Sequence, residues 1–408
     1  MTELAVYRGG GVFEKVALAD LLGRLRDRRL TTAPPFSPER IAVITELSDS
    51  LRANPQLRDR PSLAYFAHWT RGTALRALAT RFETTAVPGT LSAPRGIVLH
   101  LPPRNVETML LFSWVVSYLA GNANVVRLPT EQSGAVMEAV ELVAKHLSAV
   151  EGCAEVFVCY PAEDALNRAL SRACDARVVW GGDAKIQAFE GLPLRSGGKA
   201  IWFGDRYSYC AISGPALACA DSDELTALAY KLVADIFTFD QMACSSPHKI
   251  YVVGDATTYR PAVTALLAAV DAAARRRGAD IPTSHTIRKM TEALTLASAG
   301  AEAFVPQLSG ELISVVFSQL RQVEDRIGGG FIVVEFIPDL RTLADVVQPG
   351  HQTLTHYGFT TAEMTTFAKS SIQAGLSRIV PVGRALDFDV IWDGYDLTRE
   401  LTRTIRIA

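Results

Sequence analysis

Hydrophobic residues in the first 90 positions recur every three or four residues, a spacing that predicts amphipathic helices. The pattern covers "VALADLLGRLRDRR" (16–29) and "SLAYFAHWTRGTALRALATRF" (62–82), and the proline-rich "TTAPPFSPER" (31–40) separates the two. The sequence therefore predicts a helical layer at the amino terminus.

From Pro94 onward, short runs of β-branched and aliphatic residues alternate with longer helical patterns. Four runs predict buried strands: "GIVLHL" (96–101), "NVVRL" (124–128), "EVFVCY" (155–160) and "ARVVW" (176–180). Strands joined by helices of this length need crossover connections, so the sequence predicts a parallel, doubly wound sheet.

A second segment of alternating helices and strands begins near Tyr207. Its longest helical pattern, "ELTALAYKLVADIFTF" (224–239), leads directly into "FDQMACSSPHK" (239–249), and "KIYVVG" (249–254) and "GGFIVVEFI" (329–337) predict strands beyond it. A chain of 408 residues exceeds the roughly 250–300 residues that usually share one core, so we expect two lobes.

Composition narrows the class of protein. The net charge is −2, so no basic field exists to attract nucleic acid or an anionic membrane. The start "MTELAVYRGGGVFEK" lacks a signal-peptide pattern, and the longest apolar run, "MLLFSWVVSYLA" (109–120), is shorter than the roughly 20 residues of a membrane helix. We expect a cytoplasmic protein with no membrane span and no nucleic-acid partner.

The six cysteines show no Cys-x-x-Cys pairing and no histidines at zinc spacing, so we expect neither a disulfide framework nor a metal site. Five of them are expected to be inert, buried thiols. Cys244 differs because its turn, between a long helix and a strand, can offer backbone N–H groups to a thiolate. It is either a nucleophile or another buried thiol.

A dinucleotide-binding fingerprint, G-x-G-x-x-G, is absent. The "RGGG" at residues 8–11 is not expected to follow a strand. Either the chain binds no dinucleotide, or it holds the phosphates in another way.

The order of several short motifs favours the second possibility. "HLPPRNVET" (100–108), "GNANVVRLP" (121–129), "WGGD" (180–183), the cysteine turn and "VVEFIP" (333–338) follow one another in the order that resembles the aldehyde dehydrogenase superfamily. The separations of 22 residues from Asn105 to Arg127 and of 91 residues from Cys244 to Glu335 are also similar to those of that superfamily.

Within that superfamily, the chain resembles LuxC-type acyl-CoA reductases, which reduce long-chain fatty acyl-CoA. The resemblance rests on "FAHWTRGTALRAL" (66–78), "QMACSSP" (241–247) and "AGLSRIVPVGRALDFDVIWDG" (374–394), and it extends from about Leu63 onward. It implies an α/β fold of the aldehyde dehydrogenase type, with two doubly wound parallel-sheet lobes and a helical amino-terminal layer, in a homo-oligomer.

On this resemblance, we expect four parts. Residues 1–90 would form the helical amino-terminal part of the cofactor lobe, and residues 91–206 the dinucleotide-binding lobe. Residues 207–383 would form the catalytic lobe with the cysteine, and residues 384–408 a carboxy-terminal return and oligomerisation segment.

The resemblance implies that Cys244 attacks the acyl carbonyl and that Asn105 stabilises the oxyanion, although Asn105 could also cap the following helix. Hydrolytic relatives carry a water-activating glutamate in an E-L-G-G-K motif. The matching stretch here is "WFGDRYS" (202–208), with Trp202 or Phe203 at the carboxylate's position. Without that base, hydrolysis of an acyl-enzyme should be slow, so the direction from thioester to aldehyde is favoured.

For the cofactor, the resemblance implies NADPH. Pro103 belongs to the Pro-x-Asn turn, Arg127 stands near the adenosine ribose, and Thr130 replaces a carboxylate that would repel a 2′-phosphate. Glu131, one position away, leaves NADH possible, and Arg127 could instead be a solvated charge at a strand end.

Three further residues complete the expected cofactor site. Gly182 and Asp183 match the turn that brings the pyrophosphate to a helix start. Glu335 would hold the nicotinamide ribose; otherwise it is a surface charge at a strand end.

His248 could pair with Cys244, but the superfamily uses no such dyad. Trp392 stands where relatives have a histidine.

These observations predict NADPH-dependent reduction of an acyl thioester, on CoA or on an acyl carrier protein, to an aldehyde. One alternative is an acylating or oxidising aldehyde dehydrogenase. Another is a subunit that keeps the fold, accepts an acyl group on Cys244 or serves interactions, and performs no redox reaction.

Overall fold

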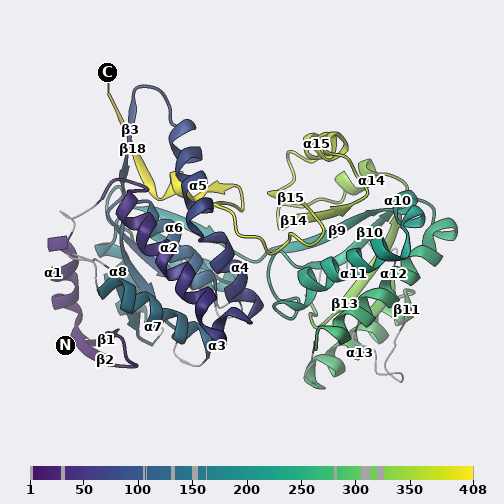
Figure 1. Cartoon of the computed structure of the whole chain (residues 1–408), viewed down its shortest axis with the longest axis horizontal. Helices are drawn as coiled ribbons and strands as arrows, with labels where there is room; N and C mark the ends of the chain where they lie inside the picture. Colours follow the sequence, from purple (N-terminus) through teal and green to yellow (C-terminus); the bar gives the residue numbers. More distant parts are fainter. Residues whose placement is uncertain are drawn as a thin grey trace. The chain divides into compact units, whose positions relative to one another are not determined.

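The computed structural model describes residues 3–28, 33–103, 106, 108–129, 134–148, 155–161, 163–279, 283–304, 313–318 and 326–407. The chain divides into two compact units. The first unit contains Met1–Gly204 and Phe388–Ala408, and the second contains Asp205–Asp387. Each unit is built around one seven-stranded sheet, shown in Figure 1.

The sheet of the first unit has the strand order of a dinucleotide-binding fold. Its order is β2 (Phe13–Ala17), β1 (Glu3–Tyr7), β6 (Glu155–Cys159), β5 (Ala123–Arg127), β4 (Ile97–Leu101), β7 (Ala176–Trp180) and β8 (Lys199–Phe203). The five strands from β6 to β8 are parallel. The chain winds outward from β4 in one direction and from β7 in the other, so a topological switch point lies between β4 and β7.

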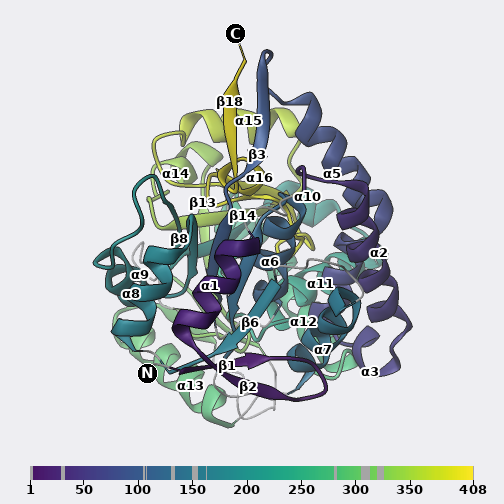
Figure 2. The same ribbon diagram turned by 90° about the vertical axis from the view of Figure 1, so that its left-hand side faces the viewer.

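Helices cover both faces of this sheet, as Figures 1 and 2 show. One face packs against α1 (Leu18–Arg28), α8 (Asp164–Ala173) and α9 (Asp183–Glu190). The other packs against α6 (Met109–Leu119) and α7 (Ala135–Ser148), with α2 (Pro38–Ala53), α3 (Pro55–Arg58), α4 (Pro61–Trp69) and α5 (Gly72–Thr84) outside them. Burial on both faces explains why every residue of β4 and β7 is buried, and why both strands are mainly apolar rather than alternating.

Residues 3–17 differ from the helical layer expected for the amino terminus. They form the β1–β2 hairpin, and β1 extends the sheet by antiparallel pairing with β6. The "RGGG" loop therefore does follow a strand, contrary to expectation, but it leads into a second strand and not into a helix. Its Gly10 N–H donates to the Glu141 carboxylate of α7 at 2.7 Å, so a side chain of the protein already occupies this loop.

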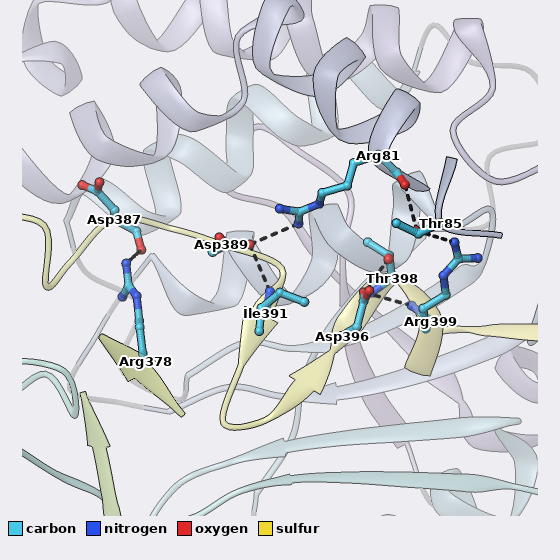
Figure 3. A network of polar contacts seen from close by, with 9 residues as sticks. All are labelled: Arg81, Thr85, Arg378, Asp387, Asp389, Ile391, Asp396, Thr398 and Arg399. Atoms are coloured by element: carbon cyan, nitrogen blue, oxygen red, sulfur yellow. Dashed lines mark hydrogen bonds and ion pairs between the residues drawn. The ribbon is translucent and has the colours of Figure 1, made fainter. Parts of the chain in front are cut away.

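The carboxy-terminal segment returns to the first unit and is tied to α5, as Figure 3 shows. Arg81 of α5 donates to Asp389 at 3.2 Å, and Arg399 donates to the Thr85 hydroxyl at 2.8 Å. Beyond these contacts, β18 (Thr402–Arg406) pairs antiparallel with β3 (Thr90–Pro94). This pairing forms a two-stranded sheet from segments that are about 300 residues apart in the sequence.

The sheet of the second unit is also doubly wound. Its order is β11 (Glu302–Phe304), β12 (Ser314–Phe317), β13 (Phe331–Ile337), β10 (Pro247–Val253), β9 (Tyr207–Ser213), β14 (His351–Tyr357) and β15 (Arg378–Pro381). All neighbours are parallel except β11 and β12. One face packs against α10 (Gly214–Cys219), α11 (Ser222–Phe237) and α12 (Ala256–Arg276), and the other against α13 (Thr283–Ser298), α14 (Leu340–Ala344) and α15 (Thr361–Ser370). None of the helices in the described ranges is long and apolar enough to cross a bilayer.

A buried polar network crosses the centre of the first sheet. His100 on β4 is fully buried, with Nδ1 at 2.8 Å from the Ser113 hydroxyl and Nε2 at 2.9 Å from Asn124 Oδ1. Because an amide oxygen only accepts, Nε2 carries the proton and Nδ1 accepts from Ser113. Burial lowers the pKa of His100 to about 4, so this ring stays neutral at physiological pH.

His100 predicts a specific loss of stability in acid. Its folded pKa lies below its unfolded value, so below about pH 6.5 only the unfolded state gains the proton, and stability falls until about pH 4. The integrated loss is about 3 kcal/mol. We expect His100→Gln to remove this part of the pH dependence of unfolding, measured by thermal or urea denaturation between pH 4 and 8. His68→Gln, on the exposed surface of α4, is the matched control, and equal slopes in wild type and His100→Gln would contradict the assignment.

Candidate active site

Cys244 lies in a turn that is held at the amino-terminal edge of the second sheet. Its carbonyl accepts a hydrogen bond from the Ser208 hydroxyl at 2.6 Å, and the same hydroxyl accepts from Thr353 N–H at 3.1 Å. The neighbours Ala243 and Ser245 are buried, whereas Cys244 is half-buried. The turn thus holds its backbone inside the protein and leaves Cys244 partly accessible, as a nucleophile requires.

Other cysteines contrast with Cys244. Cys210 on β9 is completely buried, and burial raises the pKa of its thiol to about 12, so it remains a protonated, inert thiol. Cys174, which follows α8, is equally buried. Cys159 is half-buried and Cys219 is exposed, so the expectation of buried thiols is wrong for these two.

His248 is a buried aromatic neighbour and a poor base. Its ring stacks on Tyr207 with centroids 5.6 Å apart, and burial lowers its pKa to about 3. Its Nε2 atom has no hydrogen-bond partner among the residues that the structure describes. A base of such low pKa cannot hold a proton taken from a thiol at neutral pH, which argues against a Cys244–His248 dyad.

Glu335 belongs to a buried ion pair. It is 7% exposed, stands in register with Tyr251 of the neighbouring strand β10, and lies 2.6 Å from the ammonium group of Lys249. The alternative that Glu335 is a surface charge at a strand end is therefore wrong. Lys249, which the sequence interpretation missed, compensates the buried carboxylate and so fixes its orientation. A lysine five residues after the cysteine was the available signal.

Arg127 ends β5 and is anchored to an aromatic ring. Its guanidinium carbon lies 4.6 Å from the centre of the Tyr160 ring, and Nη2 donates to the Tyr160 carbonyl at 3.2 Å. Arg127 is thus a half-buried charge at the strand end that is held by Tyr160. The contact holds the guanidinium at the carboxyl end of the strand. Thr130 and Glu131, expected to act beside it, lie outside the described residues.

Lys185 ties together the two sides of the topological switch point. Its ammonium group donates to the carbonyls of Trp180 at 2.7 Å, Leu101 at 3.1 Å and Pro102 at 3.0 Å. Gly181, with φ of 155°, makes room for this side chain, because a Cβ there would lie 2.6 Å from Lys185 Cδ. The sequence interpretation missed Lys185, although it follows the "WGGD" motif by two residues.

The residues expected at the cofactor phosphates lie beside this edge. Gly182 is the N-cap of α9 and has no side chain to occupy the helix start, which suits an anion. The carboxylate of Asp183 approaches Gly204 instead, with Oδ1 2.7 Å from the position of a Cβ there.

The Pro-x-Asn turn is only partly described. Pro103 is half-buried just after β4, but Asn105 lies outside the described residues. The N-cap of α6 is Thr108, whose side chain makes no capping hydrogen bond.

An aromatic stack occupies the region where the sequence departs from hydrolytic relatives. Phe203 stacks on Trp180 with centroids 3.6 Å apart and an angle of 11°, and Trp392 meets the same Trp180 ring at 6.4 Å. Trp202 points to the other face of the strand, 5.0 Å below the guanidinium of Arg177. Phe203, at the position of the missing glutamate, and Trp392, at the position of a family histidine, therefore both contact the Trp180 ring. Neither Trp202 nor Phe203 can activate water.

Comparisons with known proteins support the predicted family. The profile of the family described as "Acyl-CoA reductase (LuxC)" matches residues 78–404. A long-chain acyl-protein thioester reductase from Photorhabdus laumondii subsp. laumondii is 25% identical over 167 residues, which are 40% of this chain and 33% of that protein. The alignment thus spans about a third of the relative's length.

Solved structures confirm the predicted fold. Methylmalonate-semialdehyde dehydrogenase from Oceanimonas doudoroffii has a TM-score of 0.68 at 14% identity, covering 99% of this chain and 94% of that one. A putative aldehyde dehydrogenase from Burkholderia cenocepacia has a TM-score of 0.66 at 16% identity, covering 100% and 97%. 1-Pyrroline-5-carboxylate dehydrogenase from Thermus, with bound NAD, has a TM-score of 0.67 at 13% identity, covering 99% and 90%.

At these identities the structures establish the aldehyde dehydrogenase-like fold alone. The family profile, by contrast, covers most of the sequence and includes both the cysteine turn and the carboxy-terminal return. This chain belongs to the acyl-CoA reductase (LuxC) family.

Proposed function

We propose that this protein reduces an acyl thioester to an aldehyde with a reduced nicotinamide cofactor, through an acyl group carried by Cys244. The observation that carries the proposal is the aromatic environment at the position of the missing water-activating glutamate. Phe203 stacks on Trp180, and Trp202 lies against Arg177, so neither side chain at the matching position supplies a carboxylate. Family membership supports the same direction of reaction.

In the first step, the Cys244 thiolate attacks the thioester carbonyl. A carbon–sulfur bond forms to Cys244, the bond to the carrier breaks, and the carrier leaves as a thiol after taking a proton. The backbone around Cys244 suits this step because the Ser208 hydroxyl holds the carbonyl of the nucleophile's own residue. A fixed backbone sets the direction of the Cys244 N–H, which is the first donor proposed for a developing oxyanion. By resemblance, Asn105 supplies the second donor.

The residues at the edge of the first sheet fit a nicotinamide dinucleotide. Arg127 retains N–H groups for a 2′-phosphate while its guanidinium rests on Tyr160, which favours NADPH over NADH. Gly182 leaves the start of α9 open to phosphate oxygens. By family resemblance, Pro103, Thr130 and Asp183 would line the same cofactor, and Glu335 would hold a ribose hydroxyl. When bound, the reduced nicotinamide supplies the hydride.

The thiol carrier is CoA or a protein. The family is described as acyl-CoA reductase, whereas the Photorhabdus relative is named for an acyl-protein thioester. We propose that the chain accepts both classes of thioester, because the reacting carbonyl and the leaving thiol are chemically the same. The alternatives are an acylating or oxidising aldehyde dehydrogenase and an acyl-carrying subunit without redox activity.

Cys244→Ser should lower aldehyde formation by at least about a thousandfold, because the hydroxyl cannot replace the thiolate. The assay combines acyl-CoAs of several lengths and an acylated carrier protein with NADPH or NADH, and follows A340 and aldehyde. Cys219→Ser, at an exposed cysteine, is the matched control and should retain activity.

The same assay separates the alternatives. Acid formation from aldehyde and NAD(P)⁺ without CoA would identify an oxidising dehydrogenase. A stable acylated Cys244, seen by intact mass, together with no cofactor-induced thermal shift would identify an acyl-carrying subunit. Either result would overturn the proposal.

Arg127→Gln should raise the KM for NADPH by about tenfold to a hundredfold, because it removes a charged partner of the 2′-phosphate. The KM for NADH should change little. Steady-state kinetics with both cofactors measure the difference, and Arg168→Gln on the exposed face of α8 is the matched control. An equal loss with NADH would show that Arg127 acts on something other than the 2′-phosphate.

A further inference from the structure

The turn that carries Cys244 has an unusual backbone. Asp240 and Gln241 have φ values of 50° and 62°, in the left-handed region that residues other than glycine rarely adopt. Two consecutive residues of this kind persist only where their surroundings compensate the strain. The compensation is visible at both residues.

The side chain of Gln241 joins three parts of the second unit. It is completely buried; its amide nitrogen donates to the carbonyls of Pro247 at 2.8 Å and Phe331 at 2.9 Å, and its oxygen accepts from Gly330 N–H at 3.0 Å. Two carbonyls and one N–H around a single amide fix which end is oxygen and which is nitrogen. The turn is thereby fastened to the first residues of β10 and β13.

A triple glycine receives the other side of the turn. Gly328, Gly329 and Gly330 have φ values of 78°, 60° and 80°. Gly329 N–H donates to the Asp240 carbonyl at 2.9 Å. A Cβ on Gly328 would lie 2.7 Å from Met242 Sδ and 3.0 Å from the Asp240 carbonyl. The glycine loop can therefore lie against the turn only because it carries no side chains.

We infer that Gln241, together with the Gly328–Gly330 loop, is the positioning device of Cys244. Gln241 fixes the backbone three residues before the cysteine, and Ser208 fixes the carbonyl of the cysteine itself. On the far side, the Ser246 hydroxyl donates to the Asp235 carbonyl at 2.8 Å. The turn is held before, at and after Cys244, so the direction of the thiol and of its own N–H is set by buried hydrogen bonds.

This inference rests on the proposed function, in which Cys244 is the nucleophile. It differs from a merely structural role, because a residue that only stabilises the fold would change the unfolding temperature and leave the reactivity of the folded thiol unchanged. The test therefore measures the thiol directly and needs neither thioester nor nicotinamide.

The variant Gln241→Met keeps the length of the side chain and removes all three hydrogen bonds. Iodoacetamide labelling from pH 6 to 9.5 is followed on the tryptic peptide 232–249, in which Cys244 is the sole cysteine. We expect the labelling rate of Cys244 to fall by about tenfold or more, with a shifted pH midpoint, because a small displacement of a reacting group has effects of this size. Labelling of the exposed Cys219 should not change.

Kinetics on the complete chain give a second readout. The kcat for acyl thioester should fall with Gln241→Met, while the KM for the nicotinamide cofactor stays within about twofold. Gln241→Glu keeps the oxygen that accepts from Gly330 but turns a second acceptor oxygen toward the carbonyls of Pro247 and Phe331, so it should also slow the labelling. Asp271→Asn is the matched control for stability. Asp271 lies on α12, away from the turn, and its carboxylate accepts from Ile313 N–H at 3.1 Å. This substitution should leave the labelling rate of Cys244 unchanged.

If Gln241→Met does not fold, Gly328→Ala tests the device from the opposite side. Its methyl group meets Met242 and the Asp240 carbonyl, so it should slow the labelling of Cys244 in the same way. A wild-type rate and pH profile of labelling in a folded variant of either residue would overturn the inference. Failure of the proposed function would look different. The variants would still label Cys244 more slowly than the wild type, but the wild type would form no aldehyde from any acyl thioester.

Discussion

Two neighbouring parallel strands can be connected only by a crossover, which places helices on the faces of the sheet. When helices cover both faces, polar groups remain accessible only at the two edges where the strands begin and end. Both units of this protein obey that constraint. In the first unit, Arg127 and Trp180 end β5 and β7 and Pro102 follows β4, so the three residues lie at the same edge of the sheet. Lys185 joins two of these ends through backbone carbonyls.

The second unit uses the opposite edge. Cys244 precedes β10, and the groups that hold its turn, Ser208, Phe331 and Thr353, stand at or near the beginnings of β9, β13 and β14. The position of a residue near a strand end does not by itself fix the direction of its side chain. In this turn, the three hydrogen bonds of the buried Gln241 amide hold the backbone that precedes Cys244. The turn of Cys244 is therefore held by side-chain hydrogen bonds to backbone atoms, in a strained conformation that the neighbouring glycine loop can accommodate.

The aromatic stack brings together two positions at which the sequence departs from its relatives. Phe203 stands where hydrolytic relatives carry a glutamate, and Trp392 stands where relatives of the family carry a histidine. Phe203 and Trp392 are separated by almost 190 residues of sequence, yet both contact Trp180. An apolar stack cannot hold or transfer the protons that water attack requires. The lack of a water-activating group at Phe203 is the basis of the proposed direction of reaction.

The sequence alone established the repeated alternation of helices and strands, and hence the fold, because buried parallel strands leave strong hydrophobic runs such as those of β4 and β7. It also singled out Cys244, Arg127 and Glu335 through their order along the chain. It did not reveal the β1–β2 hairpin, whose short strands obtain their stability from pairing with β6.

The environments of the selected residues depended on tertiary structure. Glu335 is a buried partner of Lys249 and not a surface charge, and His248 is a neutral ring against Tyr207. Whether Gln241 faces solvent or spans the starts of two strands is decided by contacts with residues about 90 positions away. Periodicity reports which residues are buried, but hydrogen-bond partners are chosen only when distant segments meet, and that choice fixed the chemistry of the cysteine turn.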